Sequence, residues 1–152
     1  MLRHGASGWL SIALGVWLCG VFATPASAQV MPGIRAGLSV DPDQFYIGGH
    51  VETMPLVDRL HFRPNVEAGF GDDITLVAIN FEFIYRFPLR QQWQVYAGGG
   101  PSLNVISDGQ SDTAAGFNFL IGAEQRGGLF FELKIGAADS PGMKFNVGYA
   151  FH

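Results

Sequence analysis

The stretch ITLVAINFEFIYRF, residues 74–87, alternates between two kinds of residue along its whole length. One set is mostly large and apolar: Thr75, Val77, Ile79, Phe81, Phe83, Tyr85 and Phe87. The other set is smaller or more polar: Leu76, Ala78, Asn80, Glu82, Ile84 and Arg86. A period of two residues is typical of a β-strand whose two faces meet different surroundings. The stretch therefore predicts one long strand.

The same alternation recurs on both sides of this strand. Seven further strands are expected at 33–40, 45–54, 60–70, 93–106, 114–124, 129–137 and 143–152, and no segment after Gln29 shows a helical period. Eight consecutive strands with short connections favour an antiparallel up-and-down barrel. Within 93–106, Pro101 follows Gly98, Gly99 and Gly100, and a proline inside a central strand predicts a bulge or a break.

The composition excludes several other classes of protein. The chain has 152 residues, enough for one modest domain, and only 14% of them are charged, against ~25% in typical soluble domains. With 48% hydrophobic residues it is too apolar for a disordered chain. Its net charge of -4 offers no basic surface for a nucleic acid, so no nucleic-acid partner is expected.

Residues 1–28 have the pattern of a secretory signal peptide. Arg3 precedes an apolar run from Trp9 to Ala23, and Ala26-Ser27-Ala28 forms a small-x-small cleavage site. The run is shorter than the ~20 residues of a membrane-spanning helix, although an uncleaved anchor is the alternative. Cleavage would remove Cys19, the single cysteine, and leave residues 29–152 as one barrel domain.

The two faces of the strands indicate which side of the barrel meets which solvent. One face of each strand carries the large apolar residues. The other face is mostly Gly, Ser, Asn and Ala with isolated charges, whereas the outer face of a soluble barrel would carry many charges. Large apolar residues outside and a polar lumen are the pattern of a transmembrane β-barrel. Because an unpaired buried charge is costly, we expect an internal ion-pair network of Arg63, Arg86, Lys134 and Lys144 with Glu52, Glu67, Glu82 and Glu132. Side chains can just fill an eight-stranded barrel, so no large pore is expected.

The connections divide into two ends of different charge. Seven of the eight Asp residues lie in 41–44, 71–73, 107–113 and 138–142, whereas 55–59, 88–92 and 125–128 hold Asp58, Arg59, Arg90 and Arg126. We interpret the Asp residues as turn formers or, alternatively, as ligands for Ca²⁺ or Mg²⁺ at an outer rim. Interfacial aromatic girdles are expected from Phe62, Tyr85, Phe87 and Trp93 at one end and Phe45, Phe70, Phe117 and Phe145 at the other.

The signal peptide, the eight alternating segments and the terminal run Phe145, Val147, Tyr149 and Phe151 resemble the small outer-membrane β-barrels of Gram-negative bacteria, the OmpA-like and OmpX-like group. The resemblance implies an all-β, eight-stranded antiparallel up-and-down transmembrane β-barrel. It also implies a monomer in the outer membrane, inserted by the barrel-assembly machinery and in contact with outer-membrane lipids and lipopolysaccharide. We expect a structural or surface role without enzyme activity, catalytic residue, metal or cofactor. The family's last strand usually ends on an aromatic residue, whereas here His152 follows Phe151.

Two alternatives remain open from the sequence. A soluble periplasmic barrel of lipocalin type would turn the aromatic face inward and bind a small apolar ligand. A lipid A-modifying barrel enzyme would need a Ser, a His and an acid together, for which Ser39, His50 and Glu52 are candidates. These three lie on the predicted lumen face, away from a lipid substrate. The histidines His50, His61 and His152 form no zinc motif.

Overall fold

The computed structural model describes residues 29–88 and 91–152, and it consists of eight strands in chain order. The predicted signal peptide, residues 1–28, lies outside the described residues, and so does Arg90. The strands are β1 (Val30–Val40), β2 (Gln44–Thr53), β3 (Leu60–Gly71), β4 (Ile74–Arg86), β5 (Trp93–Ser107), β6 (Ser111–Gln125), β7 (Leu129–Ala138) and β8 (Met143–Ala150). Within these ranges no helix is long and apolar enough to cross a membrane.

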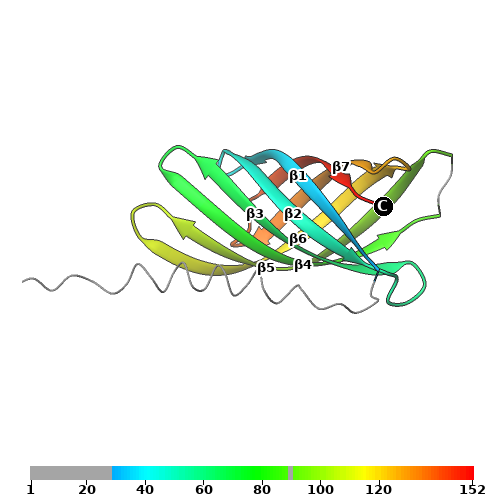
Figure 1. The fold of residues 1–152 in the computed structure, drawn as a ribbon. Helices are drawn as coiled ribbons and strands as arrows, with labels where there is room; N and C mark the ends of the chain where they lie inside the picture. The colour runs from blue at the N-terminus through cyan, green and yellow to red at the C-terminus, as the bar shows by residue number, and fades with distance from the viewer. Residues whose placement is uncertain (1–28, 89–90) are drawn as a thin grey trace, which may run out of the picture.

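Each strand pairs antiparallel with its neighbours in the sequence, and β1 pairs with β8 to close the barrel (Figure 1). The closing ladder runs from Gly33 opposite Ala150 to Val40 opposite Met143. Closure leaves no free sheet edge along this seam. The predicted all-β, eight-stranded up-and-down barrel is therefore confirmed.

The alternation seen in the sequence separates the inside of the barrel from the outside. In β4, Phe81, Phe83 and Tyr85 are exposed, whereas Glu82 and Ile84 are fully buried. Successive side chains of a strand point to opposite faces of the sheet. A shift of the strand by one residue would therefore turn the apolar side chains inward and the polar ones outward. The predicted phase holds along β4, and the buried face there is the lumen face.

The bulge or break predicted at Pro101 is wrong. Strand β5 runs without interruption from Trp93 to Ser107, and its register with β6 continues through Pro101 opposite Phe117. The ladder to β4 instead lapses between the pairs Asn80–Ser102 and Phe83–Gly99. A Cβ atom on Gly100 would overlap the carbonyl oxygen of Phe81. Glycine therefore allows β5 to lie close against β4, and the strand accommodates the proline without an inserted residue.

Candidate functional site

The lumen holds a balanced set of ten charged side chains, which we call the lumen network. It is drawn from every strand except β5, and each member is at most 7% exposed. Its basic members are Arg35, Arg63, Arg86, Lys134 and Lys144, and its acidic members are Glu52, Glu67, Glu82, Glu124 and Glu132. Buried charges are tolerated in proteins when they are paired and hydrogen-bonded, and the equal numbers allow full pairing.

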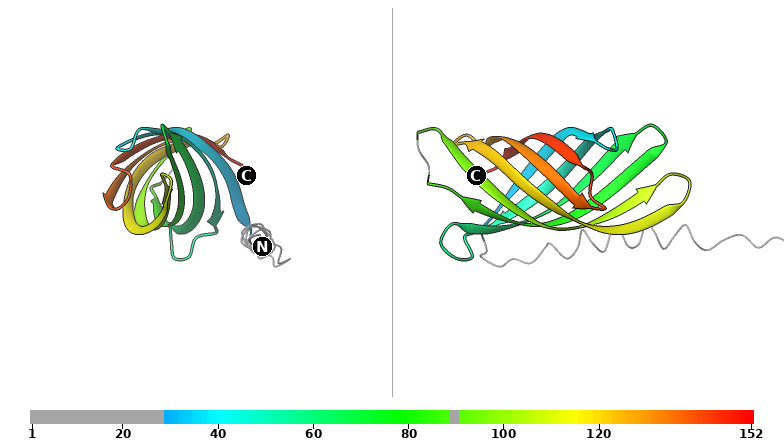
Figure 2. Two further views of the ribbon diagram at one scale, coloured as in Figure 1. Left: turned by 90° about the vertical axis from the view of Figure 1, so that its left-hand side faces the viewer. Right: turned by 180° about the vertical axis from the view of Figure 1, so that it is seen from behind.

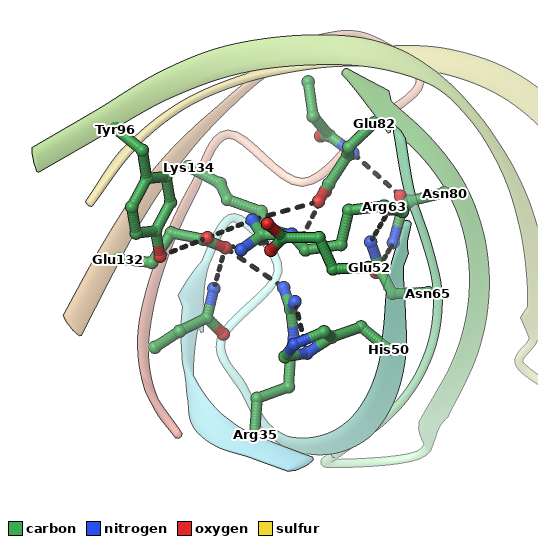
Figure 3. Close-up of polar contacts among 12 residues, drawn as sticks. Arg35, His50, Glu52, Arg63, Asn65, Asn80, Glu82, Tyr96, Glu132 and Lys134 are labelled. Atoms are coloured by element: carbon green, nitrogen blue, oxygen red, sulfur yellow. Dashed lines mark hydrogen bonds and ion pairs between the residues drawn. The ribbon is translucent and has the colours of Figure 1, made fainter. Parts of the chain in front are cut away.

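Glu132, on β7, is the centre of the network (Figure 3). Its carboxylate accepts hydrogen bonds from Arg35 Nη1 at 3.0 Å, from the Tyr96 hydroxyl at 2.9 Å and from Asn146 Nδ2 at 3.2 Å. Arg63 Nη2 also donates to Glu132 Oε2, the same oxygen that accepts from Tyr96. A buried carboxylate needs donors of this kind, because each donor offsets part of the hydration that the group loses on burial.

The two lysines join opposite walls of the barrel. Lys134, on β7, lies 2.5 Å from Glu82 on β4 and 2.8 Å from Glu67 on β3, measured from Nζ to the carboxylate oxygens. Lys144, on β8, reaches the other oxygen of Glu67 at 2.6 Å. These contacts connect strands that are not neighbours in the sheet. They therefore cross the lumen rather than line it.

A second group of contacts lies toward the end of the barrel that carries both termini. Arg86 donates two parallel hydrogen bonds to Glu52, from Nε at 2.6 Å and from Nη2 at 2.7 Å, and a third to Glu124 at 2.9 Å. His61 lies 3.2 Å from Glu52, and His152 lies 3.0 Å from Glu124. A cavity of about 580 Å³ opens beyond these groups, and its lining includes Arg59, His61, Arg86, Glu124 and His152. Its mixed charges do not specify one class of ligand.

Side-chain amides form a ladder next to the charged groups. Asn118 Nδ2 donates to Asn80 Oδ1 at 2.8 Å, and Asn80 Nδ2 donates to Asn65 Oδ1 at 2.7 Å. Asn118 and Asn80 belong to β6 and β4, so the ladder passes over β5, where Gly100 is opposite Asn118. The ladder satisfies polar groups that would otherwise be buried without partners.

Aromatic rings fill the space between the charges. Tyr96 is fully buried, and the guanidinium carbons of Arg63 and Arg86 lie 5.1 and 5.3 Å from its ring centre, within the range of a cation–π contact. A Cβ atom on Gly122 would overlap the Tyr96 ring. In the same way, Gly148 leaves space for Phe130. Part of the unusual glycine content therefore makes room for rings inside the barrel.

The structure confirms the four-and-four set of lumen charges expected from the sequence. All eight are buried, and each lies within salt-bridge distance of an opposite charge. The prediction omitted two further members, Arg35 and Glu124. Both belong to the buried phase of their strands, so the alternation contained the signal that could have found them.

The candidate triad of the alternative enzyme is not assembled. His50 Nδ1 lies 2.9 Å from Arg35 Nη2, and the Ser39 hydroxyl donates to the Pro42 carbonyl oxygen at 2.8 Å. Glu52 is held by Arg86. A triad requires hydrogen bonds from the acid to the histidine and from the histidine to the serine. Each of these side chains instead has a separate partner.

The Asp-rich connections have the geometry of turns. Asp41 and Asp73 adopt positive φ values of 57° and 60°, and Asp58, at the opposite end, has a φ of 49°. Asp tolerates this left-handed conformation better than most residues, which accounts for its use here. Across residues 29–88 and 91–152, no group of three or more His, Cys, Asp and Glu residues could hold a metal ion. The geometry favours turn formation over the cation site considered from the sequence.

The outer face of the barrel is apolar. Large apolar residues with at least 37% exposure come from all eight strands and include Ile34, Leu38, Ile47, Val66, Phe81, Leu103, Phe119, Ile135 and Phe145. The soluble lipocalin-like alternative needed this aromatic face to line an inner cavity, so its orientation is wrong. Among the residues predicted for the girdles, Tyr85 and Phe87 have ring centres 5.2 Å apart, and Phe45 is opposite Phe70 across β2 and β3.

No protein-family model and no curated protein matches the chain, but solved structures do. The N-terminal β-barrel domain of Pseudomonas aeruginosa OprF is 15% identical with a TM-score of 0.62, and the match covers 80% of this chain and 96% of that one. Neisserial surface protein A, NspA, is also 15% identical, with a TM-score of 0.55 and coverage of 80% and 96%. A de novo designed transmembrane β-barrel is 12% identical, with a TM-score of 0.57 and coverage of 83% and 98%. The chain therefore has the fold of the small eight-stranded outer-membrane β-barrels.

Proposed function

We propose that this chain is an integral outer-membrane β-barrel protein with a structural or surface role and a lumen closed by its own side chains. The observation that carries the proposal is a reversal of polarity across one wall. Charged and amide side chains are buried inside, and large apolar side chains are exposed outside. A protein surrounded by water has the opposite arrangement.

The exterior supports insertion into a bilayer. In hydrocarbon every backbone polar group needs a partner within the protein, which restricts membrane-spanning structures to helices and closed barrels. The β1–β8 ladder supplies that closure. An apolar surface extending around the whole barrel would cause association in water, whereas lipid acyl chains solvate it.

The interior supports a closed barrel rather than a channel. Contacts of Lys134 with Glu67 and Glu82, together with those of Glu132 with Arg35 and Arg63, connect opposite walls across the lumen. Moving these groups aside would separate buried opposite charges, which is costly. Because these charged side chains are held in ion pairs with one another, we propose no enzyme activity.

The remaining elements of the proposal concern the route to the membrane and the surroundings of the barrel. Residues 1–28 act as a cleaved secretory signal, and the barrel-assembly machinery inserts residues 29–152 as a monomer. The end that carries the termini faces the periplasm, as in other outer-membrane barrels. The Asp-rich end then faces outward, where lipopolysaccharide is the neighbouring lipid.

Two measurements test this proposal. The chain expressed with residues 1–28 is expected in the outer-membrane fraction, as a shorter mature protein whose gel mobility changes on heating. A soluble periplasmic product would overturn membrane insertion. In planar bilayers the purified protein is expected to show no large conductance, and stable large openings would overturn the closed lumen while leaving insertion intact.

A further inference from the structure

The connection between β2 and β3 exposes more apolar surface than its position explains. Within its sequence Met54-Pro55-Leu56-Val57-Asp58-Arg59, Met54 is 48% exposed, Leu56 53% and Val57 72%. Val57 is the most exposed large apolar residue in the part of the chain that the structure describes. Connections that meet water are usually polar. Three such side chains within four residues therefore indicate that something apolar covers them.

The loop has a defined conformation that holds these side chains outward. Leu56 N donates to Leu60 O at 2.7 Å, and Leu60 N donates to Val57 O at 2.9 Å. The carbonyl oxygen of Arg59 accepts a hydrogen bond from Arg86 N at 3.0 Å, which ties the loop to the end of β4. These bonds fix the turn through the backbone, so the side chains of Leu56 and Val57 are not needed for its internal packing.

Part of the loop borders the mouth of the barrel, where Pro55, Asp58 and Arg59 line the cavity, but the loop as a whole projects sideways. Seen along the barrel axis, the segment between β2 and β3 lies outside the ring of strands (Figure 2, left). Figure 1 and the right panel of Figure 2 show the same segment beyond the barrel wall. On the wall beside it, Leu60 is opposite Tyr85, and Phe87 is 43% exposed. The apolar residues of the loop are therefore continuous with the apolar exterior of the barrel.

We propose that the β2–β3 loop is a membrane-interface anchor, in which Met54, Leu56 and Val57 insert among the lipids of the leaflet nearest the chain termini. The inference rests on the proposed membrane insertion of the barrel. Lipid is the occupant because the loop projects into the space that a bilayer fills around the wall, at the edge of the apolar belt. Asp58 and Arg59 follow directly and remain at the level of the polar headgroups. Apolar residues beside charged ones are typical of segments that lie at a membrane interface.

Single-tryptophan reporters test the position of the loop. Trp93 is the sole tryptophan of residues 29–152, so Trp93→Phe gives a background without tryptophan. Three reporters are then added separately: Val57→Trp in the loop, Phe81→Trp on the outer face of β4 and Gln110→Trp in the exposed β5–β6 turn. Each is refolded into phosphatidylcholine vesicles whose acyl chains carry bromine, a quencher, either near the headgroup or near the bilayer centre.

The expected result is a depth order. Bromine near the headgroup should reduce the emission of the Val57→Trp reporter more than bromine near the bilayer centre does. Bromine near the bilayer centre should quench Phe81→Trp. Gln110→Trp should lose little emission in either lipid. If Val57→Trp behaves like Gln110→Trp while Phe81→Trp is quenched, the anchor is overturned and the barrel insertion stands. If Phe81→Trp is not quenched either, the membrane proposal itself fails, and the anchor fails with it.

A second label avoids the bulk of tryptophan. Residues 29–152 contain no cysteine, so Leu56→Cys gives a unique site for a nitroxide spin label. The label should collide more often with oxygen, which concentrates in lipid, than with a water-soluble nickel complex. A Gln110→Cys label is the matched control and should show the reverse preference. The same reverse preference at Leu56→Cys would overturn the anchor.

Discussion

Phe81 and Glu82 are neighbours in β4, yet they meet opposite surroundings. The Phe81 side chain points outward and is 39% exposed, whereas Glu82 is fully buried beside Lys134 and Arg63. If the outer face meets lipid as proposed, neighbouring side chains there act almost independently, because lipid can fill any gap between them. On the lumen face, each charge depends on partners from other strands. The two faces of one wall should therefore respond very differently to substitution.

The largest effect is expected on the lumen face, at the centre of the network. Glu132→Gln removes the negative charge that Arg35 and Arg63 share. Breaking a buried pair in this way leaves uncompensated charge, and we expect a loss of about 3–5 kcal/mol in the free energy of unfolding. Urea unfolding in detergent micelles, followed by gel mobility, measures it.

Glu124→Gln is the matched control for this substitution. Glu124 lies at the mouth of the barrel and lines the cavity at the end with the termini, where water can reach its partners. Glu124→Gln should therefore lower the free energy of unfolding clearly less than Glu132→Gln does. If both variants lose the same free energy of unfolding, ion pairs at the centre of the lumen contribute no more to stability than those at its mouth.

The next effect concerns the outer face and depends on depth. Phe81→Arg places a charge near the middle of β4, where the bilayer centre is expected, and should cost about 2–4 kcal/mol. Phe87→Arg, just beyond the end of the same strand, should cost only about 0–1 kcal/mol. Unfolding from lipid vesicles in urea measures both. Equal costs would contradict the membrane orientation of β4, because both side chains have similar exposure, 39% and 43%.

A smaller effect is expected from replacing glycines by alanine, one glycine on the lumen face and one on the outer face. A methyl group on Gly100 would overlap the Phe81 carbonyl oxygen, so Gly100→Ala must shift β5 away from β4 and should cost about 1–3 kcal/mol. At the outward-facing Gly49, the nearest atom to an added Cβ is the Gly33 carbonyl oxygen at 3.6 Å, an ordinary contact. Gly49→Ala should change stability by less than about 0.5 kcal/mol. Urea midpoints of the two variants test this, and a harmless Gly100→Ala would show that β5 does not need its close approach to β4.

The smallest effect is expected at the edge of the network. His152 pairs with Glu124 but its side chain is 42% exposed, and exposed pairs contribute about 0–1 kcal/mol. His152→Ala should therefore leave the urea midpoint nearly unchanged. A loss approaching that of Glu132→Gln would mean that the pair with Glu124 belongs to the structural centre of the lumen.

The alternation in the sequence predicted more of this molecule than any individual motif did. It located all eight strands, because a wall with two different solvents imposes a period of two on every strand that forms it. The same period could have added Arg35 and Glu124 to the predicted charges, since both share the phase of their buried neighbours. The bulge expected at Pro101 failed for a different reason. Proline chemistry was visible in the sequence, but the close approach of β4 to Gly100 was not.

The sequence by itself determined the class of fold, the number of strands and which residues share a face of each strand, and the structure then showed that the charged face lines the lumen. Only the tertiary structure decided which charges meet, because the side-chain period specifies a face and leaves open the height along the barrel axis. That height follows from the register of every ladder and from the closure of β1 on β8. Glu132 can bind Arg35, Arg63 and Tyr96 together only after closure brings β1, β3 and β5 around β7. Likewise, the outward projection of the β2–β3 loop is a property of the closed wall.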